Sequence, residues 1–294
     1  MPYDDDDVDY EPEYEEDEDE DRESNLLGYD FAPYPTLFVT KDGEKTQTAG
    51  KALWLGMEIE VRSQAWYRWS DVESLSRFSD NIFMKHDGSL HERDGFEIVT
   101  RPMHPDYMRS FVPKLSELLQ NLSIMGHSAG EGYGMHVHVS RAAFTPLHLA
   151  KLIVFMSDEN RELLVNVAQR DNAEWCEIKT KRMRSEDVCN PDGDKYQALA
   201  TFRERTIEYR IFRSNTQANR ILKNIEFVLA TVEYTRNCGI RELTTDSFLK
   251  WLKNHRKEYL NLYKFLAEKE KDSNYTGRYA DVLNHRRAKR AANA

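Results

Sequence analysis

The chain has 294 residues, 40% of them hydrophobic, which is enough for one large domain or two small ones with a sizeable core. No apolar run approaches the length of about 18 residues that a transmembrane helix needs, and the acidic N-terminus is not a secretory signal. The net charge is −10, but residues 1–24 contain 15 acidic residues and one arginine, whereas the rest contains 36 acidic and 40 basic residues. The folded part is therefore expected to be slightly basic.

Residues 1–33 are predicted to form a disordered acidic tail, because they cannot bury enough apolar surface to offset the entropy lost on ordering. The tail reads either as a solubilising segment or as an interaction arm that competes for a basic groove or attracts a basic partner. The three cysteines, Cys176, Cys189 and Cys238, show no metal or disulfide spacing and indicate reduced thiols in the cytoplasm.

The stretch LWLGMEIEVR at 53–62 reads as a β-strand with two different faces. Successive strand side chains point to opposite sides, so Glu58, Glu60 and Arg62 share one face. The other face is apolar and is expected to pack against a core. Its members are Leu53, Leu55, Met57, Ile59 and Val61.

The elements that follow mix strands and helices, which favours an α/β or α+β class. A loop is expected after residue 62, then strands at 82–86 and 95–100 with a turn between them. Helices are expected over 104–122, from Thr145 to about Arg170, over 217–236, and in two or three pieces over 245–290. Residues 171–197 are polar and irregular and could form a lid or substrate loop.

The most informative stretch is GMHVHVS at 134–140. As a strand, it places His136, His138 and Ser140 on one face, with the two imidazoles about 7 Å apart. A third strand, TIEYRIF at 206–212, places Glu208 and Arg210 together in the same way. Carboxylates from several strands with two histidines and an arginine make a ligand set for a hard divalent cation beside an anion, and favour Mg²⁺ or Mn²⁺ over structural Zn²⁺.

These motifs resemble those of a known superfamily. GYGMHVHVS is similar to the histidine strand of glutamine synthetase, GMEIE to its Glu-x-Glu metal strand, and TIEYR to its Glu-x-Arg strand. DGSL followed by GFEIVT resembles the next pair of strands in the phage and bacterial amidoligases, which are carboxylate–amine ligases related to glutamine synthetase and glutamate–cysteine ligase. The resemblance covers roughly residues 50–237, and a phage or bacterial source is suggested by it alone.

The resemblance implies an ATP-dependent ligase that forms an amide or isopeptide bond through an acyl phosphate, with Mg²⁺ or Mn²⁺. Arg210, His138 and Glu97 would be catalytic, and Asp87 or Glu92 could supply one further carboxylate. The metal ligands would be Glu58, Glu60, Glu97, His136 and Glu208, and the nucleotide contacts would be His138, Arg210, Arg101 and Lys195.

The implied fold is α+β, a curved and mainly antiparallel sheet that forms a funnel and is backed by helices. The catalytic domain is expected over residues 34–240 and a C-terminal helical extension over 241–294. The expected partners are small-molecule or peptide carboxylates and amines, with an acidic donor such as glutamate or a peptide terminus. Neither a membrane nor nucleic acid is expected as a partner, and the oligomeric state stays open.

Two other classes of function stay open. The histidines and glutamates could serve a metal-dependent hydrolase or nuclease that activates water and needs no ATP. The chain could also be a non-catalytic binding protein that acts through its acidic tail, with the sheet as a scaffold.

Overall fold

The computed structural model describes residues 26–64, 69–90, 94–126, 132–170, 176–178 and 196–269. Most of the acidic tail, Glu92, Cys189, Lys195, nearly all of the loop at 171–195 and the basic segment after 269 lie outside these residues. None of the helices in the described ranges combines the length and apolar character needed to cross a lipid bilayer.

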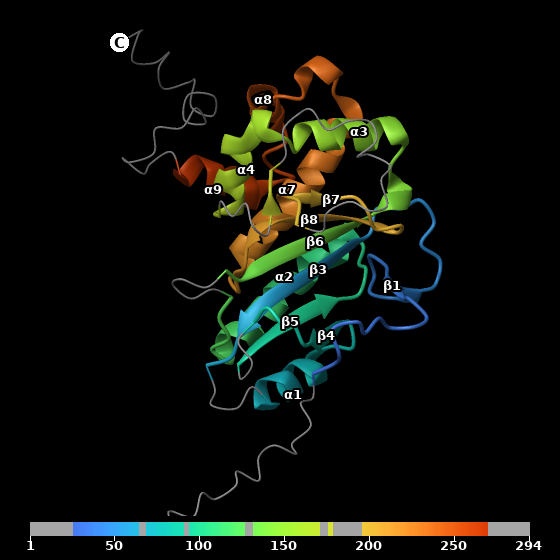
Figure 1. Cartoon of the computed structure of the whole chain (residues 1–294), viewed down its shortest axis with the longest axis vertical. Coiled ribbons are helices and arrows are strands. Elements are labelled where there is room, and N and C mark those ends of the chain that lie inside the picture. The colour runs from blue at the N-terminus through green and yellow to red at the C-terminus, as the bar shows by residue number, and fades with distance from the viewer. Residues whose placement is uncertain are drawn as a thin grey trace, which may run out of the picture.

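The centre of the molecule is a six-stranded sheet in the order β4-β5-β3-β6-β8-β7, in which every neighbouring pair is antiparallel (Figure 1). Together with the helices, this sheet confirms the predicted α+β class. The strands are β3 (Leu55–Arg62), β4 (Ile82–Lys85), β5 (Gly95–Thr100), β6 (Gly134–Ser140), β7 (Leu199–Ala200) and β8 (Thr206–Arg213), and a separate small pair is formed by β1 (Phe38–Val39) and β2 (Lys45–Thr46).

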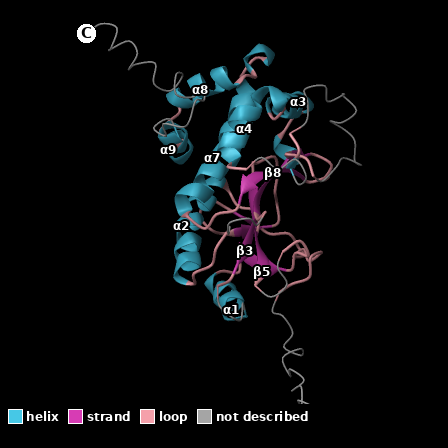
Figure 2. Cartoon of the chain, turned by 60° about the vertical axis from the view of Figure 1, so that its left-hand side comes forward, coloured by secondary structure: helices cyan, strands magenta, loops and turns pink. Residues whose placement is uncertain are grey.

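Helices cover one face of the sheet, as Figure 2 shows for α2 and α7. The buried Tyr209 of β8 contacts Thr231 of α7 through its hydroxyl at 3.0 Å, and Phe212 meets Phe227 edge to face. Burial of the apolar strand face against these helices is the main stabilising term of the fold. The helices are α1 (Trp69–Phe78), α2 (Pro105–Asn121), α3 (Pro146–Phe155), α4 (Arg161–Ala168), α7 (Ala218–Asn237), α8 (Thr245–Asn254) and α9 (Leu260–Lys269).

The structure differs from the sequence prediction at two helices. Residues 69–78, expected in a loop, form α1, which buries Val72 and Leu75. The single helix expected from Thr145 to about Arg170 is broken after α3, where Ser157 is extended. The buried Asn160 stabilises this break, because its side-chain amide donates to the carbonyl oxygens of Phe155 and Leu243.

The predicted domain boundaries also need correction. Leu26 is buried in the core, and Leu27 pairs with Lys85 at the edge of β4, so the ordered part begins before residue 34. At the other end, Leu262 and Leu266 of α9 belong to the same hydrophobic core as the sheet. Residues 241–269 are therefore packed onto the main domain.

We expect the stability of the fold to fall in mild acid because of His148. This α3 side chain is buried, stacks on Phe144 and contacts Val232 O at 2.9 Å. Burial, with Arg236 and Lys151 nearby, lowers the pKa of His148 to about 4. The folded state then binds fewer protons than the unfolded state between about pH 6.5 and pH 4, so stability is lost as the pH falls through that window.

Urea unfolding of the wild type and of His148→Gln, which keeps a hydrogen-bond donor, measures this effect. The wild type should lose up to about 1.4 kcal/mol more per pH unit than the variant below about pH 6. If the free energy of unfolding depended on pH in the same way in the wild type and in His148→Gln, the His148 imidazole would not be neutral in the folded state.

Candidate active site

The polar face of the sheet opposite α2 and α7 collects the residues singled out in the sequence. The register pairs Glu58 with His136 between β3 and β6, and His138 with Glu208 between β6 and β8. On the other side of β3, Glu60 pairs with Glu97 of β5. Directly paired residues of antiparallel strands point to the same face, so four strands contribute to one cluster.

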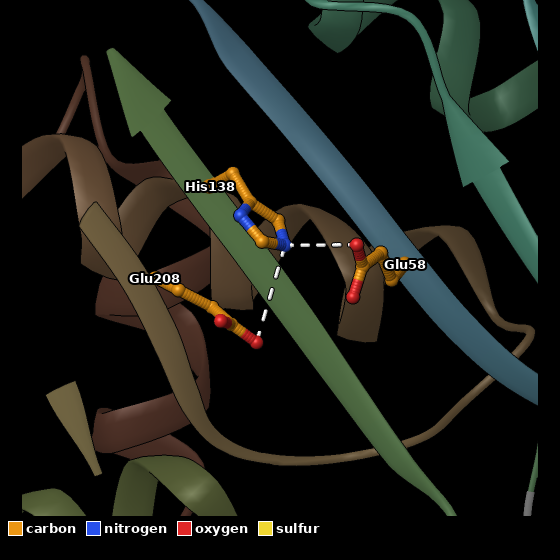
Figure 3. Close-up of side chains that lie close together, drawn as sticks. All are labelled: Glu58, His138 and Glu208. Carbon is orange, nitrogen blue, oxygen red and sulfur yellow. Dashed lines mark ion pairs between the residues drawn. The ribbon is translucent and has the colours of Figure 1, made fainter. Parts of the chain in front are cut away.

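Glu58, His138 and Glu208 point toward one another from three neighbouring strands (Figure 3). His138 Nε2 lies 3.1 Å from Glu58 Oε1 and 4.0 Å from Glu208 Oε1. This nitrogen is buried, and no group in the described part of the chain is oriented to form a well-aligned hydrogen bond with it. Glu58 and Glu208 are ion-pair partners of this imidazole, and a bound group would compete with them for the nitrogen.

His136 joins the same cluster from the neighbouring position on the face. Its Nδ1 lies 3.3 Å from Glu58 Oε2 and 3.4 Å from Glu208 Oε1, and its Nε2 lies 3.8 Å from Glu60 Oε1. Glu60 is oriented in turn by the backbone N–H of Gly134, which donates to its carboxylate. Both imidazoles are thus surrounded by carboxylate oxygens.

Two arginines face the fully buried carboxylate of Glu208. Arg210 Nη1 donates to Glu208 Oε1, and Arg203 Nε lies 3.4 Å from Glu208 Oε2. Arg210 Nε is buried and has no hydrogen-bond partner among the described residues. Arg210 therefore has an unused donor for an anion, and the half-exposed Arg203 stands beside it.

Burial, together with the charges of neighbouring carboxylates and histidines, shifts the pKa values of the cluster. Burial, reinforced by Glu58, Asp87 and Glu60, raises the pKa of Glu97 to about 9. Burial alone would also raise the pKa of Glu58, but His138 and His136 outweigh it and hold that pKa well below its usual range. Burial alone would lower the pKa of His138, but Glu58 and Glu208 raise it.

The donor set suits divalent cations. Glu58, His138 and Glu208 each offer one ligand atom within 4.8 Å of the others, and Glu58, Glu97 and His136 do the same. Glu58 is common to both groups, so the geometry can hold two neighbouring ions with mainly oxygen ligands, as Mg²⁺ and Mn²⁺ prefer. A cation would also offset the burial and the carboxylate repulsion that raise the pKa of Glu97.

A cavity of about 350 Å³ lies where the strands end beyond Glu60. Arg213 is paired with Gly134 in the register, so its side chain belongs to the face that carries His136. The Ser214 hydroxyl donates to Glu60 O at 2.6 Å, which ties the cavity wall to the cluster. The lining residues are Met125, Gly126, Gln169, Arg213, Ser214, Asn215, Thr216 and Gln217.

Arg170 directly follows Gln169, one of the residues that line this cavity. Arg170 donates to the carbonyl oxygens of Gly132, Arg210 and Ile211. A Cβ at Gly134 would lie 3.0 Å from the Arg170 guanidinium, so a larger residue here would require the guanidinium to shift.

The structure thus brings together Glu58, Glu60, Glu97, His136, His138, Glu208 and Arg210. Arg101 does not contact the cluster within the described part of the chain; it stacks on Phe83 and donates to Asp80 O. Asp87 lies close enough to influence Glu97, and Lys195 and Glu92 lie outside the described residues.

Sequence reasoning missed Arg203, Arg170 and Arg213. Arg203 and Arg170 lie outside the strands, where no periodicity applies. Arg213 was hidden by an irregularity: the register between β6 and β8 shifts between Met135 and Val137, so Phe212 turns to the core and Arg213 to the polar face. Simple alternation from Glu208 places residue 212 on the polar face instead.

No protein-family model matches the chain, and no curated protein matches it in sequence. Among solved structures, it is similar to a glutamine synthase homolog, with 13% identity and a TM-score of 0.39, over 83% of this chain and 68% of that one. It is also similar to PafA, the ligase of the prokaryotic ubiquitin-like protein Pup, solved in complex with Pup, with 11% identity and a TM-score of 0.34, over 80% of this chain and 62% of that one. Both TM-scores are below 0.5, so these similarities do not assign a function to the chain.

Proposed function

We propose that the protein is an ATP-dependent carboxylate–amine ligase that works with Mg²⁺ or Mn²⁺. The observation that carries this proposal is the convergence of four carboxylates, two imidazoles and Arg210 on one face of four adjacent strands. Carboxylates and imidazoles suit the cations that accompany ATP, and Arg210 and Arg203 provide positive charge for a phosphoryl group. A hydrolase that only activates water has no need for this pair of arginines against Glu208.

The reaction has two balanced steps. A carboxylate oxygen of the acid attacks the γ-phosphorus of ATP, ADP leaves, and an acyl phosphate forms. The amine nitrogen then attacks the acyl carbon, inorganic phosphate leaves, and the nitrogen loses a proton as the amide forms. Bound cations would neutralise phosphate charge, and the residues that would hold them are Glu58, Glu60, Glu97, His136 and Glu208.

The side chains themselves position anions and compensate charge. The free Nε of Arg210 can donate to a phosphoryl oxygen as charge builds up in the transition state. His138 Nε2 lies between Glu58 and Glu208 and can contact the same phosphoryl group. Both groups are held in place by neighbouring carboxylates, so little reorganisation is needed.

The cavity beyond Glu60 is the best place for the acid substrate. Its volume of about 350 Å³ is at the lower end of the range for small-molecule sites. Arg213 makes no ion pair within the described ranges, and a guanidinium binds a carboxylate through two parallel hydrogen bonds. This arrangement favours an acid with a second carboxylate that remains unmodified.

Arg213→Gln should therefore raise KM for the acid at least about tenfold and change kcat much less, because the lost contact is made in the ground state as well. Lys250→Gln, an exposed change on α8, is the matched control. Equal losses in kcat and kcat/KM would place Arg213 in the chemistry rather than in binding.

The proposed reaction is tested by trapping. The protein is incubated with ATP, Mg²⁺, hydroxylamine and a panel of mono- and dicarboxylic acids, and hydroxamates and ADP are read by mass spectrometry. A hydroxamate that forms only with ATP shows an acyl phosphate. Hydrolysis of a substrate without ATP would instead support a metal-dependent hydrolase.

Removal of residues 1–24 distinguishes between two functions, a ligase and a binding protein that acts through its acidic tail. We expect the truncated protein to keep its catalytic rate and, at low salt, to show a lower apparent KM for ATP, because the acidic tail would repel or replace the nucleotide. The KM difference should fade as salt rises. Loss of activity on truncation would favour the tail as the functional element.

A further inference from the structure

A second group of metal-type ligands lies outside the sheet, at the junction of α7, α8 and α9. Glu233 comes from the C-terminal half of α7, His255 ends α8, and Glu258 lies in the turn before α9. Their ligand atoms all lie within 4.8 Å of one another. The group shares no residue with the candidate active site.

The imidazole of His255 is prepared to act as a ligand. Its Nδ1 lies 2.8 Å from Trp251 O, a carbonyl that can only accept, so Nδ1 carries the proton and Nε2 presents its lone pair. The ring also stacks on Trp251, with centroids 4.1 Å apart and planes at 23°. A backbone hydrogen bond from the second ring nitrogen is the usual support of a metal-bound histidine.

The carboxylates of Glu233 and Glu258 can also act as metal ligands. The hydroxyl of the buried Tyr259 donates to Glu233 Oε2 and orients that carboxylate. Glu258 is exposed, and within the described ranges neither Glu233 nor Glu258 forms an ion pair. One nitrogen and two oxygen ligands match zinc-type coordination rather than the all-oxygen shells of Mg²⁺ and Ca²⁺.

We propose that Glu233, His255 and Glu258 form a second metal site that binds Zn²⁺ or a similar transition metal and fastens the α8–α9 turn to α7. The ion would connect three segments that also meet through the ring contact of Trp251 with Tyr259 and the hydrogen bond from Tyr259 to Glu233. Its role is structural, and it does not depend on the proposed ligase activity.

The test uses tag-free full-length protein that carries Glu58→Gln and His138→Gln, so that the active-site cluster no longer competes for metal. Zn²⁺ is titrated by calorimetry, and Co²⁺ is followed by its visible absorption. We expect one Zn²⁺ per chain and a Zn²⁺-dependent rise in Tm that EDTA reverses. An absence of Zn²⁺ binding in this background would overturn the proposal.

Two further variants in this background locate the site. Glu258→Gln changes an exposed side chain and should weaken Zn²⁺ binding at least about tenfold without lowering the Tm of the metal-free protein. His255→Gln should abolish the Co²⁺ spectrum. Glu117→Gln, an exposed change on α2, is the matched control and should bind as tightly as the background protein. Unchanged Zn²⁺ affinity in both site variants would also overturn the proposal.

Discussion

Glu58→Gln should abolish ligase turnover, by about 10³-fold or more, and should lower the stability of the metal-free fold less than Glu208→Gln does. Glu58 contacts both His136 and His138 and belongs to both groups of possible metal ligands. Its replacement by a neutral amide therefore removes a ligand from two ions at once. The same change removes repulsion toward Glu208, which offsets part of the lost attraction to the imidazoles.

Glu208→Gln provides the contrasting case. Turnover should be lost as well, but the free energy of unfolding should fall by about 3 kcal/mol, because the largely buried Arg210 loses its carboxylate partner. The exposed Glu44→Gln on the loop before β2 is the control for both changes.

Turnover is measured as ATP-dependent hydroxamate formation, and stability as urea unfolding with EDTA present. A Glu58→Gln protein that turns over normally would remove Glu58 from the site. An equally large loss of stability in Glu58→Gln and Glu208→Gln would point to a structural role for the whole cluster.

Much of the sheet could be predicted from the sequence because strand alternation is a local property. Glu58, His136 and Glu208 each lie on a strand whose opposite face is apolar, so the direction of each side chain follows from the requirement to bury that face. The same reasoning could not supply the strand order, which depends on pairings between residues far apart in the chain. The order places β6 between β3 and β8, and this is why the histidines are enclosed by carboxylates.

Features that break local periodicity escaped prediction. The register shift in β8 places Arg213 on the polar face, and the kink at Ser157 divides one expected helix into α3 and α4. The kink depends on Asn160, whose hydrogen bond to Leu243 O spans 83 positions of the sequence. Arg101 was expected at the nucleotide from the family resemblance, and in the structure its guanidinium lies over Phe83. Contacts of this kind are tertiary, and they do not produce a periodic pattern in the sequence.

Glu97→Gln should change how the stability of the metal-free protein depends on pH. Burial, with Glu58, Asp87 and Glu60 nearby, raises the pKa of Glu97 from an ordinary 4.5 to about 9. Between these values Glu97 binds more protons in the folded state than in the unfolded state, so its contribution to stability is greatest at low pH and is lost as the pH rises through the window. The wild type should lose up to about 1.4 kcal/mol more per pH unit than Glu97→Gln across this range, with other titrations common to both proteins.

Saturating Mg²⁺ or Mn²⁺ should remove most of this difference, because a bound cation makes the ionised carboxylate the favoured form and releases the proton of Glu97. The measurement is a series of urea unfolding curves from about pH 5 to pH 9, with EDTA and then with metal, for the wild type, Glu97→Gln and the exposed control Glu44→Gln. Calorimetry of metal binding in buffers of different ionisation enthalpy gives an independent measure of the number of protons released. Identical pH dependences for the wild type and Glu97→Gln in EDTA would show that Glu97 is ionised without a cation and that the carboxylates of this face do not require one.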